Sequence, residues 1–348
     1  MNNKLKLINS LFNNIILRKP TPYILLFEPS QLCNCKCEFC YHWKEYDKNE
    51  LKKEEIFDIL QQAYDLGCGY LILNGGEPFI APYFEDTLKK SKEIGYNINI
   101  TTNGSMLHKI ERYYRYIDNL TVSIDSPDEK HDEYRRHKGL FKKSIEGIKY
   151  AKKYIPNIKI NFSVHDENKH KIEKMLRLVK ELDCEIFLRL LVMEHKENAD
   201  IADFRLVIKD KADIKKIADD IIRLKKNNLI VTPKTSLNFI KNEKKFRCYN
   251  SWLIMNVDSH GRIYPPCHRF EGTKELVFGS IRKNNLKEIW YSKNAEDFRK
   301  FAKKCTPDMN CYTACVLEPS LILKPHLRMI FEQLTSNSNL FNFFRKRK

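Results

Sequence analysis

Apolar residues in the middle of the chain alternate between short continuous runs and longer stretches with a helical period. A short apolar run between turn-forming residues is typical of a buried strand, and an apolar period near 3.6 residues is typical of a helix. The run 23–27 follows two prolines and predicts the first strand, and 53–66 predicts the first helix behind it. Further strands are expected at 70–73, 97–101, 119–124, 158–164 and 185–191, and helices near 83–94, 106–116, 141–153, 171–182 and 212–226.

Six strand–helix units in a row predict an α/β fold with a parallel sheet, because parallel strands need long crossover connections and these are right-handed. Periodicity alone leaves open whether the sheet is open and doubly wound or curled into a barrel. The pattern changes past residue 240, where 257–264 predicts a hairpin around a polar turn and a helix is expected near 286–301.

The composition is that of a globular protein with a large core, since 42% of the 348 residues are hydrophobic. The net charge of +17 comes from lysines spread along the chain, which is typical of a solvated surface, and no nucleic-acid-binding motif accompanies it. We therefore expect no nucleic-acid partner. Nowhere do 18 apolar residues follow one another, and no secretory signal precedes the cysteines, so we expect a cytoplasmic protein whose cysteines bind metal.

The two ends of the chain, 1–22 and 321–348, are both amphipathic and basic. The first has apolar residues at helical spacing beside lysines, and the last closes on an aromatic and basic stretch at 340–348. We expect a helix packed on the main domain and a frayed basic tail. The alternative is peripheral contact with an anionic membrane surface.

Cys33, Cys37 and Cys40 form a Cys-x3-Cys-x2-Cys run just after the first strand. Three thiolates on one short loop can hold three corners of a cubane iron–sulfur cluster and leave the fourth iron open for a substrate or cofactor. Zinc is the main alternative, but the second cysteine pair that it usually needs does not follow nearby. A disulfide or loose thiols are further alternatives, and a register of ligands that includes Cys35 stays open.

Polar motifs follow the next strands in a fixed order. Gly75, Gly76, Glu77 and Pro78 follow the strand at 70–73; Asn103 follows 97–101; and Ser123 and Asp125 close 119–124. Together with the three cysteines and the aromatic Phe39 before the last of them, these motifs resemble the radical S-adenosylmethionine (radical SAM) superfamily over about residues 23–320.

The resemblance implies a partial (β/α)6 barrel at 23–235 with a [4Fe–4S] cluster on Cys33, Cys37 and Cys40 and S-adenosylmethionine at its open iron. It also implies that the cofactor is contacted by Gly75, Gly76, Glu77, Pro78, Asn103, Ser123, Asp125 and Arg135. Of these, the turn at 75–78 would bind the cofactor's amino group, and Ser123 and Asp125 would bind its ribose. Arg135 would reach its carboxylate, with Arg136 as the alternative. The catalytic residue is left unassigned, although Glu194 and His195 lie just past the sixth strand.

Cysteines return at the end of the chain. Cys248 and Cys267 flank the predicted hairpin, and Cys305, Cys311 and Cys315 follow the last helix. Such clustering favours a second cluster over structural zinc. The stretch 240–320 resembles a SPASM or twitch-type extension that lacks some of the pattern's cysteines. It therefore implies one auxiliary [4Fe–4S] cluster on Cys248, Cys267 and Cys315, with Cys305 or Cys311 as the fourth ligand. Cys68 and Cys184, which precede their strands, are expected to be small buried hydrophobes.

The resemblance implies an enzyme that forms a 5′-deoxyadenosyl radical and abstracts hydrogen from a peptide or protein. An electron donor such as flavodoxin or ferredoxin would reduce the cluster. The first alternative is a lipid, sugar or other small metabolite modified at the membrane surface. The second is a non-catalytic iron–sulfur or zinc protein, which leaves 75–78 and 123–125 unexplained.

Overall fold

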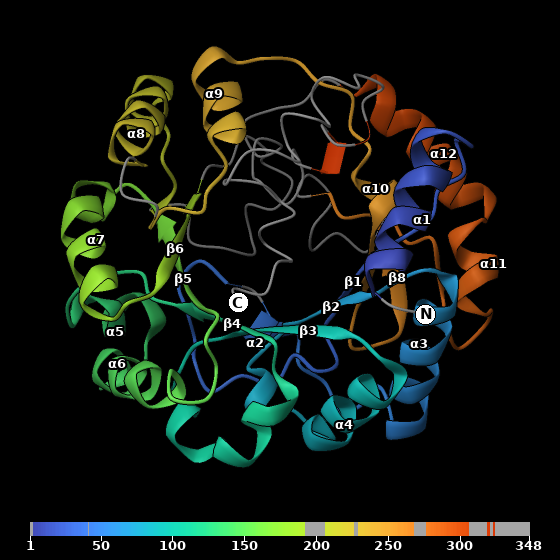
Figure 1. The fold of residues 1–348 in the computed structure, drawn as a ribbon, viewed down its shortest axis with the longest axis horizontal. Coiled ribbons are helices and arrows are strands. Elements are labelled where there is room, and N and C mark those ends of the chain that lie inside the picture. The colour runs from blue at the N-terminus through green and yellow to red at the C-terminus, as the bar shows by residue number, and fades with distance from the viewer. Residues whose placement is uncertain are drawn as a thin grey trace.

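The computed structural model describes residues 3–40, 42–191, 206–225, 229–267, 276–305, 319–320 and 323. Their strands form one sheet in the order β6-β5-β4-β3-β2-β1-β7-β8-β9 (Figure 1). The first six strands are parallel to their neighbours. They are β1 (Ile24–Phe27), β2 (Tyr70–Leu73), β3 (Asn97–Thr102), β4 (Asn119–Ser123), β5 (Ile158–Val164) and β6 (Glu185–Leu190).

Helices cover the outer face of this curved sheet (Figure 1). They are α3 (Lys53–Leu66), α4 (Phe84–Ile94), α6 (Leu140–Ala151), α7 (Ile172–Glu181) and α8 (Lys211–Leu224). The predicted α/β fold, a partial (β/α)6 barrel, is confirmed. In such a sheet the carboxyl ends of the strands meet at one end of the barrel, which is where loops carry the chemistry.

Two predicted helices are wrong in detail. The stretch near 106–116 forms two 3-10 segments, η2 (Leu107–Lys109) and η3 (Glu111–Tyr116), interrupted at Ile110, whose φ of −116° and ψ of 20° are not helical. Short 3-10 segments of this kind serve as connectors. The helix near 286–301 is two helices, α11 (Leu286–Trp290) and α12 (Lys293–Lys304), because the Ser292 hydroxyl caps a new helix by accepting the Ala295 N–H.

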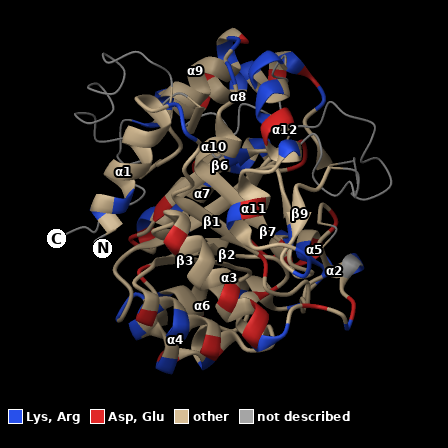
Figure 2. Cartoon of the chain, turned by 90° about the vertical axis from the view of Figure 1, so that its right-hand side faces the viewer, with Lys and Arg blue, Asp and Glu red and all other residues tan. Residues whose placement is uncertain are grey.

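The structure also contains short helices that periodicity did not predict: α2 (His42–Glu45), α5 (Lys130–Arg135), α9 (Lys234–Asn242) and α10 (Asn250–Leu253). The N-terminal helix α1 (Asn3–Ile15) lies on the barrel at the amino ends of the strands, where Asn3 donates to the Gly95 carbonyl just before β3. Figure 2 shows α1 and α2 on opposite sides of the molecule. No helix in the described part of the chain is long and apolar enough to cross a membrane.

The C-terminal region continues the barrel sheet. β7 (Ile254–Val257) runs parallel to β1 in the register Ile24↔Ile254 to Phe27↔Val257, and the antiparallel strands β8 (Arg262–Tyr264) and β9 (Gly279–Ser280) complete the sheet. The predicted hairpin is therefore confirmed.

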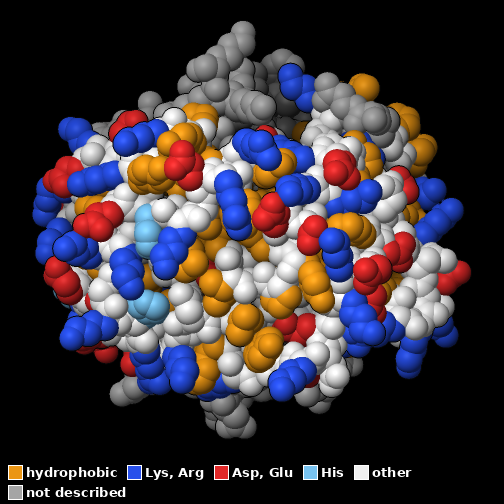
Figure 3. All heavy atoms as spheres, turned by 90° about the horizontal axis from the view of Figure 1, so that it is seen from below, with side chains coloured by type: hydrophobic (Ala, Val, Ile, Leu, Met, Phe, Trp, Pro, Cys, Tyr) orange, Lys and Arg blue, Asp and Glu red, His pale blue; other side chains and the backbone are white. Residues whose placement is uncertain are grey.

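One hydrophobic core joins the strands of the barrel to α11 and α12. Trp290 of α11 is fully buried and donates its indole N–H to the Pro20 carbonyl at 3.0 Å, which links the C-terminal region to the segment before β1. Cys68 and Cys184 are buried free thiols, as expected for small hydrophobic residues. The surface mixes lysine and arginine with acidic side chains on the face drawn in Figure 3, in agreement with a charge spread over a solvated surface.

Candidate cofactor site

The cysteine loop leaves β1 at the carboxyl end of the barrel. The thiols of Cys33, Cys37 and Cys40 pack in one small cluster with Phe39 and Leu140. The loop backbone is held from the other side by the end of α5. The Lys36 N–H donates to the Arg135 carbonyl at 3.3 Å, and the Glu38 N–H donates to the Tyr134 carbonyl at 3.1 Å. A helix that sequence periodicity missed is thus a direct support of the loop.

The thiols of this loop differ in their surroundings. A hydrogen bond with the buried Cys35 thiol, assisted by the positive charge of Arg135, lowers the pKa of the Cys37 thiol to about 7. Burial raises the pKa of the Cys40 thiol to about 12. The Cys35 sulfur also lies 3.7 Å from the Nδ1 atom of His137.

Three cysteines on one loop supply the thiolate donors that a cubane cluster uses. Within the described residues, no three His, Cys, Asp or Glu side chains are gathered closely enough to hold one metal ion. A cubane cluster, however, presents its irons at separate corners, so its thiolates need not converge on one point. The Cys33, Cys37 and Cys40 side chains pack in one cluster, and thiolates are the donors that iron–sulfur clusters use.

The turn at Gly75–Pro78 packs directly on the segment that leads into the cysteine loop. The Gly76 N–H donates to the Ser30 carbonyl at 3.0 Å, and the Glu77 N–H donates to the Leu32 carbonyl at 2.8 Å. A Cβ atom on Gly75, whose φ is +103°, would lie 2.5 Å from the Ser30 oxygen, and one on Gly76 would lie 2.1 Å from the Leu32 oxygen. The two glycines therefore permit a close approach of this turn to the chain itself.

Glu77 is buried and points into the protein. Its carboxylate accepts hydrogen bonds from the Thr102 hydroxyl at 2.7 Å, the Asn103 N–H at 2.8 Å and the Phe79 N–H at 3.3 Å. These donors are neutral, so burial prevails and raises the pKa of Glu77 to about 7. The following residues, Pro78–Ile80, form the short 3-10 segment η1.

Asn103 connects the end of β3 to the cysteine loop. Its amide donates to the Asn34 side-chain oxygen at 2.8 Å, and its own oxygen accepts the Ser105 N–H at 2.9 Å. The Asn34 amide donates in turn to the Ser105 hydroxyl at 2.8 Å. The residue that sequence analysis assigned to the cofactor thus also fixes the loop that carries the three cysteines.

Asp125 and Arg135 form a buried ion pair just past β4. The Asp125 carboxylate accepts the Arg135 Nε–H at 2.7 Å and the Ser163 N–H at 3.1 Å. The Arg135 guanidinium outweighs the effect of burial and holds the pKa of Asp125 below its usual range. Ser123 closes β4 and is also buried. Arg135 further lies over the Phe39 ring, 5.7 Å from its centre, so the pair borders the cysteine loop.

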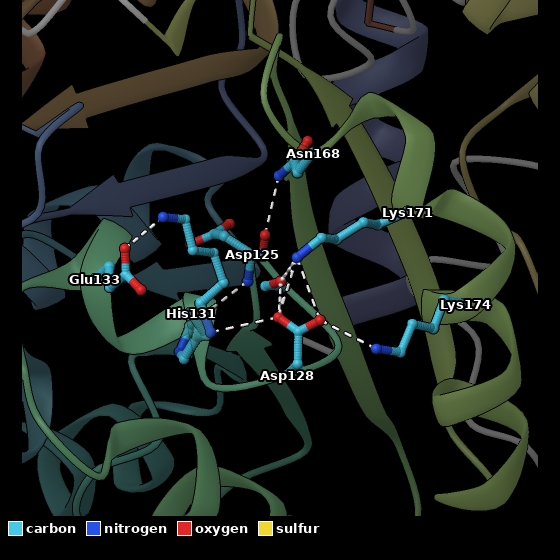
Figure 4. Close-up of polar contacts among 9 residues, drawn as sticks. Asp125, Asp128, His131, Glu133, Asn168, Lys171 and Lys174 are labelled. Carbon is cyan, nitrogen blue, oxygen red and sulfur yellow. Dashed lines mark hydrogen bonds and ion pairs between the residues drawn. The ribbon is translucent and has the colours of Figure 1, made fainter.

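The loop between β4 and α5 is fixed by several polar contacts (Figure 4). His131 accepts the Asp125 N–H at 3.0 Å, and the Asn168 amide donates to the Asp125 carbonyl at 2.9 Å. Further out, Lys171 and Lys174 both bind Asp128 at 3.1 Å. Burial opposes the charge of Asp128, but hydrogen bonds from Ser126 and these two lysines outweigh it, and its pKa lies well below the usual range.

Sequence analysis missed His165, which follows β5 at the same end of the barrel. It is fully buried, and its ring packs edge-on against Tyr134 at 4.6 Å and tilted against Phe39 at 6.4 Å between ring centres. Neither ring nitrogen finds a hydrogen-bond partner among the described residues. Its position just past a predicted strand was the signal that could have identified it.

Three of the C-terminal cysteines are described. The Asn250 amide donates to the Pro266 carbonyl at 2.7 Å, which draws together the segments that carry Cys248 and Cys267. Burial raises the pKa of the Cys248 thiol, and the nearby Cys305 adds to this shift. Cys311 and Cys315, as well as Glu194 and His195, lie outside the described residues.

The barrel, with a three-cysteine loop at the carboxyl ends of its strands and further cysteines beyond it, defines a class of enzymes that join an iron–sulfur cluster to S-adenosylmethionine. Residues 27–179 match the family model described as the Radical SAM superfamily, and residues 248–315 match the iron–sulfur cluster-binding domain SPASM. The chain therefore contains a radical SAM domain and a SPASM domain.

Two curated relatives and one solved structure illustrate the similarity. The chain is 26% identical over 304 residues to an AdoMet-dependent heme synthase of Methanosarcina barkeri, covering 80% of this chain and 84% of the relative. It is 25% identical over 283 residues to a PqqA peptide cyclase of Rhizobium meliloti, covering 79% of this chain and 75% of the relative. It shares its fold with Streptococcus suis SuiB bound to precursor peptide SuiA, with a TM-score of 0.67 and 19% identity. The match covers 86% of this chain and 70% of SuiB.

The protein is therefore a radical SAM enzyme. Its cofactors are a [4Fe–4S] cluster, S-adenosylmethionine and auxiliary iron–sulfur in the SPASM domain.

Proposed function

We propose that the enzyme modifies a peptide or protein substrate by radical hydrogen abstraction. The observation that carries the catalytic part is the junction of the cysteine loop with the ends of β2, β3 and β4. The 75–78 turn, Asn103 and the Asp125–Arg135 pair all contact or border this loop directly.

Each part of this junction has a distinct role in the proposal. Cys33, Cys37 and Cys40 hold the cluster. When bound, the reduced cluster supplies one electron that splits S-adenosylmethionine into methionine and a 5′-deoxyadenosyl radical, which takes a hydrogen atom from the substrate. A protein such as flavodoxin or ferredoxin supplies that electron.

The polar residues of the site orient the cofactor. The terminal nitrogens of Arg135 bind its carboxylate, and the Gly75–Pro78 turn binds its amino group. Ser123 binds the ribose. Glu77 and Asp125 have their carboxylates engaged by protein donors, so they act on the cofactor by holding the Asn103 backbone and Arg135 in place.

The C-terminal cysteines hold one auxiliary [4Fe–4S] cluster in this proposal. Cys248, Cys267 and Cys315 are three ligands, and Cys305 or Cys311 is the fourth. The contact between the segments of Cys248 and Cys267 supports a shared site.

The relatives support a peptide substrate. The PqqA cyclase acts on a peptide according to its name, and SuiB, which shares the fold, was crystallised with a precursor peptide. The heme synthase relative favours a second candidate, a small metabolite. A membrane lipid is less favoured, because α1, which carries the N-terminal apolar residues, lies on the opposite side of the molecule from α2, the helix that follows the cysteine loop in the chain (Figure 2).

The catalytic part is tested by anaerobic reconstitution with iron and sulfide. The reduced protein should convert S-adenosylmethionine to 5′-deoxyadenosine and methionine. A Cys33→Ala/Cys37→Ala/Cys40→Ala variant should lose this activity and keep about four irons in the auxiliary cluster. A Cys68→Ala/Cys184→Ala variant is the matched control, since these thiols lie in the core, and it should keep both activity and iron. If fully loaded protein forms no 5′-deoxyadenosine with any reductant or extract, the catalytic role is wrong.

The substrate is tested with extract from the native cells, separated into a peptide fraction and a metabolite fraction. The peptide fraction should stimulate 5′-deoxyadenosine formation, and protease treatment of that fraction should abolish the stimulation. Stimulation that survives protease and follows the metabolite fraction would replace the peptide proposal by the small-metabolite one.

A further inference from the structure

Helix α1 buries one polar face and exposes one apolar face, which an ordinary surface helix does not. Its buried side chains are polar, namely Lys6, Ser10 and Asn14. Its exposed side chains include three large apolar ones, Leu5, Ile8 and Phe12, which are 54%, 61% and 51% exposed. Isolated exposed apolar residues are normal, but these three are spaced by three and four residues and so form one stripe along the helix.

The polar side chains fix this orientation. The Ser10 hydroxyl and the Asn14 amide both donate to the Thr21 carbonyl at 2.7 Å, and the Asn14 oxygen accepts the Thr21 N–H at 3.2 Å. The Lys6 ammonium donates to the Tyr64 carbonyl at 2.5 Å and lies 3.7 Å from the centre of the Tyr64 ring. Turning the helix to bury the stripe would break all of these bonds and leave buried groups without partners.

The helix has a second, apolar contact with the protein on another face. Leu7, Leu11 and Ile15 pack against a core cluster that includes Tyr23 and Trp252. Two faces of α1 are therefore held by the protein, while the stripe of Leu5, Ile8 and Phe12 faces outward. Ile16 and Leu17, just past the helix, continue the exposed apolar surface at 62% and 57% exposure.

The charged residues of the segment that carries the stripe are all of one sign. The first 27 residues contain Lys4, Lys6, Arg18 and Lys19 and no Asp or Glu. Lys4, Arg18 and Lys19 are exposed, on either side of the stripe along the chain. An apolar stripe whose charged neighbours along the chain are all basic is complementary to an anionic lipid surface, where the apolar side chains enter the headgroup boundary and the basic ones meet phosphate.

We propose that the α1 stripe docks the enzyme on a bilayer that contains anionic phospholipid. The helix lies along the bilayer surface, with Leu5, Ile8 and Phe12 inserted and Lys4, Arg18 and Lys19 near the headgroups. This surface does not depend on the proposed substrate. It lies at the amino ends of the strands, on the side of the molecule opposite α2 (Figure 2), whereas the cysteine loop lies at their carboxyl ends. Docking therefore leaves the cysteine loop facing the surrounding solution.

Vesicle flotation of the reconstituted enzyme tests the proposal. Binding should occur with vesicles of phosphatidylcholine mixed with phosphatidylglycerol, should be weak with phosphatidylcholine alone, and should fall as salt is added. A Leu5→Ser/Ile8→Ser/Phe12→Ser variant should bind at least about a hundredfold more weakly. Replacing Lys4 or Lys19 by alanine should weaken binding about fivefold each.

The matched control replaces three exposed aromatic residues away from α1, as Tyr46→Ser/Tyr83→Ser/Tyr154→Ser, which should bind vesicles as the unaltered enzyme does. Both triple variants should retain iron and 5′-deoxyadenosine formation, which separates docking from folding and from catalysis.

Absence of binding by the unaltered enzyme would overturn the proposal. So would binding that survives the α1 substitutions but disappears when residues 324–348 are removed. A dimer in light scattering that the α1 variant dissociates, without vesicle binding, would assign the stripe to a second copy instead.

Discussion

The ends of β2 and β4 each bury one carboxylate completely, yet they treat it in opposite ways. Asp125, after β4, is paired with the Arg135 guanidinium and stays ionised, with its pKa below the usual range. Glu77, after β2, receives hydrogen bonds from neutral donors alone, and burial raises its pKa to about 7. Burial alone therefore does not decide whether a carboxyl group in the site is ionised. A cationic partner keeps the buried carboxylate charged, and neutral donors do not.

Breaking the charged pair should have the largest effect. Arg135→Met leaves the Asp125 charge buried without a cationic partner, and we expect a loss of about 3–5 kcal/mol in the free energy of unfolding. Anaerobic urea unfolding measures this. The control is Arg136→Met. The Arg136 side chain pairs with Glu38 at 3.4 Å but is 48% exposed, and solvent weakens such a surface pair, so its removal should cost at most about 1 kcal/mol. Equal losses in the two variants would contradict the importance of the buried pair.

The neutral environment of Glu77 should appear in the pH dependence of stability. Its pKa is about 7 in the folded protein and near 4.5 when unfolded, so the folded protein binds a proton more tightly. The contribution of Glu77 to the free energy of unfolding is therefore most favourable below pH 4.5. It falls by about 3 kcal/mol as the pH rises to about 7. Glu77→Gln should remove this slope, which unfolding of both proteins between pH 5 and 8 measures. If the difference in unfolding free energy between the two proteins did not change with pH, the raised pKa of Glu77 would be contradicted.

The close contact of Gly76 with the Leu32 backbone should have a somewhat smaller effect on the free energy of unfolding. Gly76→Ala places a methyl group 2.1 Å from the Leu32 carbonyl oxygen, between two stretches of backbone, and we expect a loss of about 1–3 kcal/mol. Displacement of the cysteine loop should also reduce the iron content of the reconstituted protein. Gly139→Ala is the control, since no atom lies within 4 Å and only its positive φ of +76° is strained, at a cost of about 1 kcal/mol. Full iron content in the Gly76 variant would show that the loop does not depend on this turn.

The smallest effect is expected at Asp128, which has charged partners like Asp125 but is only partly buried. Asp128→Asn should cost about 1 kcal/mol at neutral pH. Because the folded pKa of Asp128 lies below its unfolded value of 3.8, this stabilisation is present above that pH and is lost as pH falls through the folded pKa. The gap in unfolding free energy between the two proteins should thus narrow below about pH 4, the opposite direction to Glu77. A gap that widens in acid would contradict the assignment.

The strand ends and their polar motifs could be predicted from the sequence because the alternation of apolar runs and amphipathic stretches is regular. Asp125 and Arg135 were both identified, but as independent contacts to the cofactor. That they bind each other follows from α5, a helix of six mostly charged residues with too short an apolar pattern to detect. Likewise, Gly75 and Gly76 were identified only as contacts to the cofactor, and the fold shows that they also let the turn approach the residues before the cysteine loop closely.

The N-terminal helix shows a second limit of sequence reasoning. Its period was clear, but the period does not tell which face is buried. Ser10 and Asn14 would ordinarily face water, and here they are buried because the Thr21 backbone offers them partners seven to eleven positions away. A local turn thus decided the orientation of the whole helix.

The pairing of β7 with β1 has a consequence for folding. β1 is among the first elements to be synthesised, and its partner arrives after most of the chain has followed. Until then β1 is an exposed parallel edge, and such long-range pairing is slow and leaves the chain open to aggregation. A version shortened before residue 254 would carry that open edge permanently, so the SPASM region is part of what makes the barrel a finished folding unit.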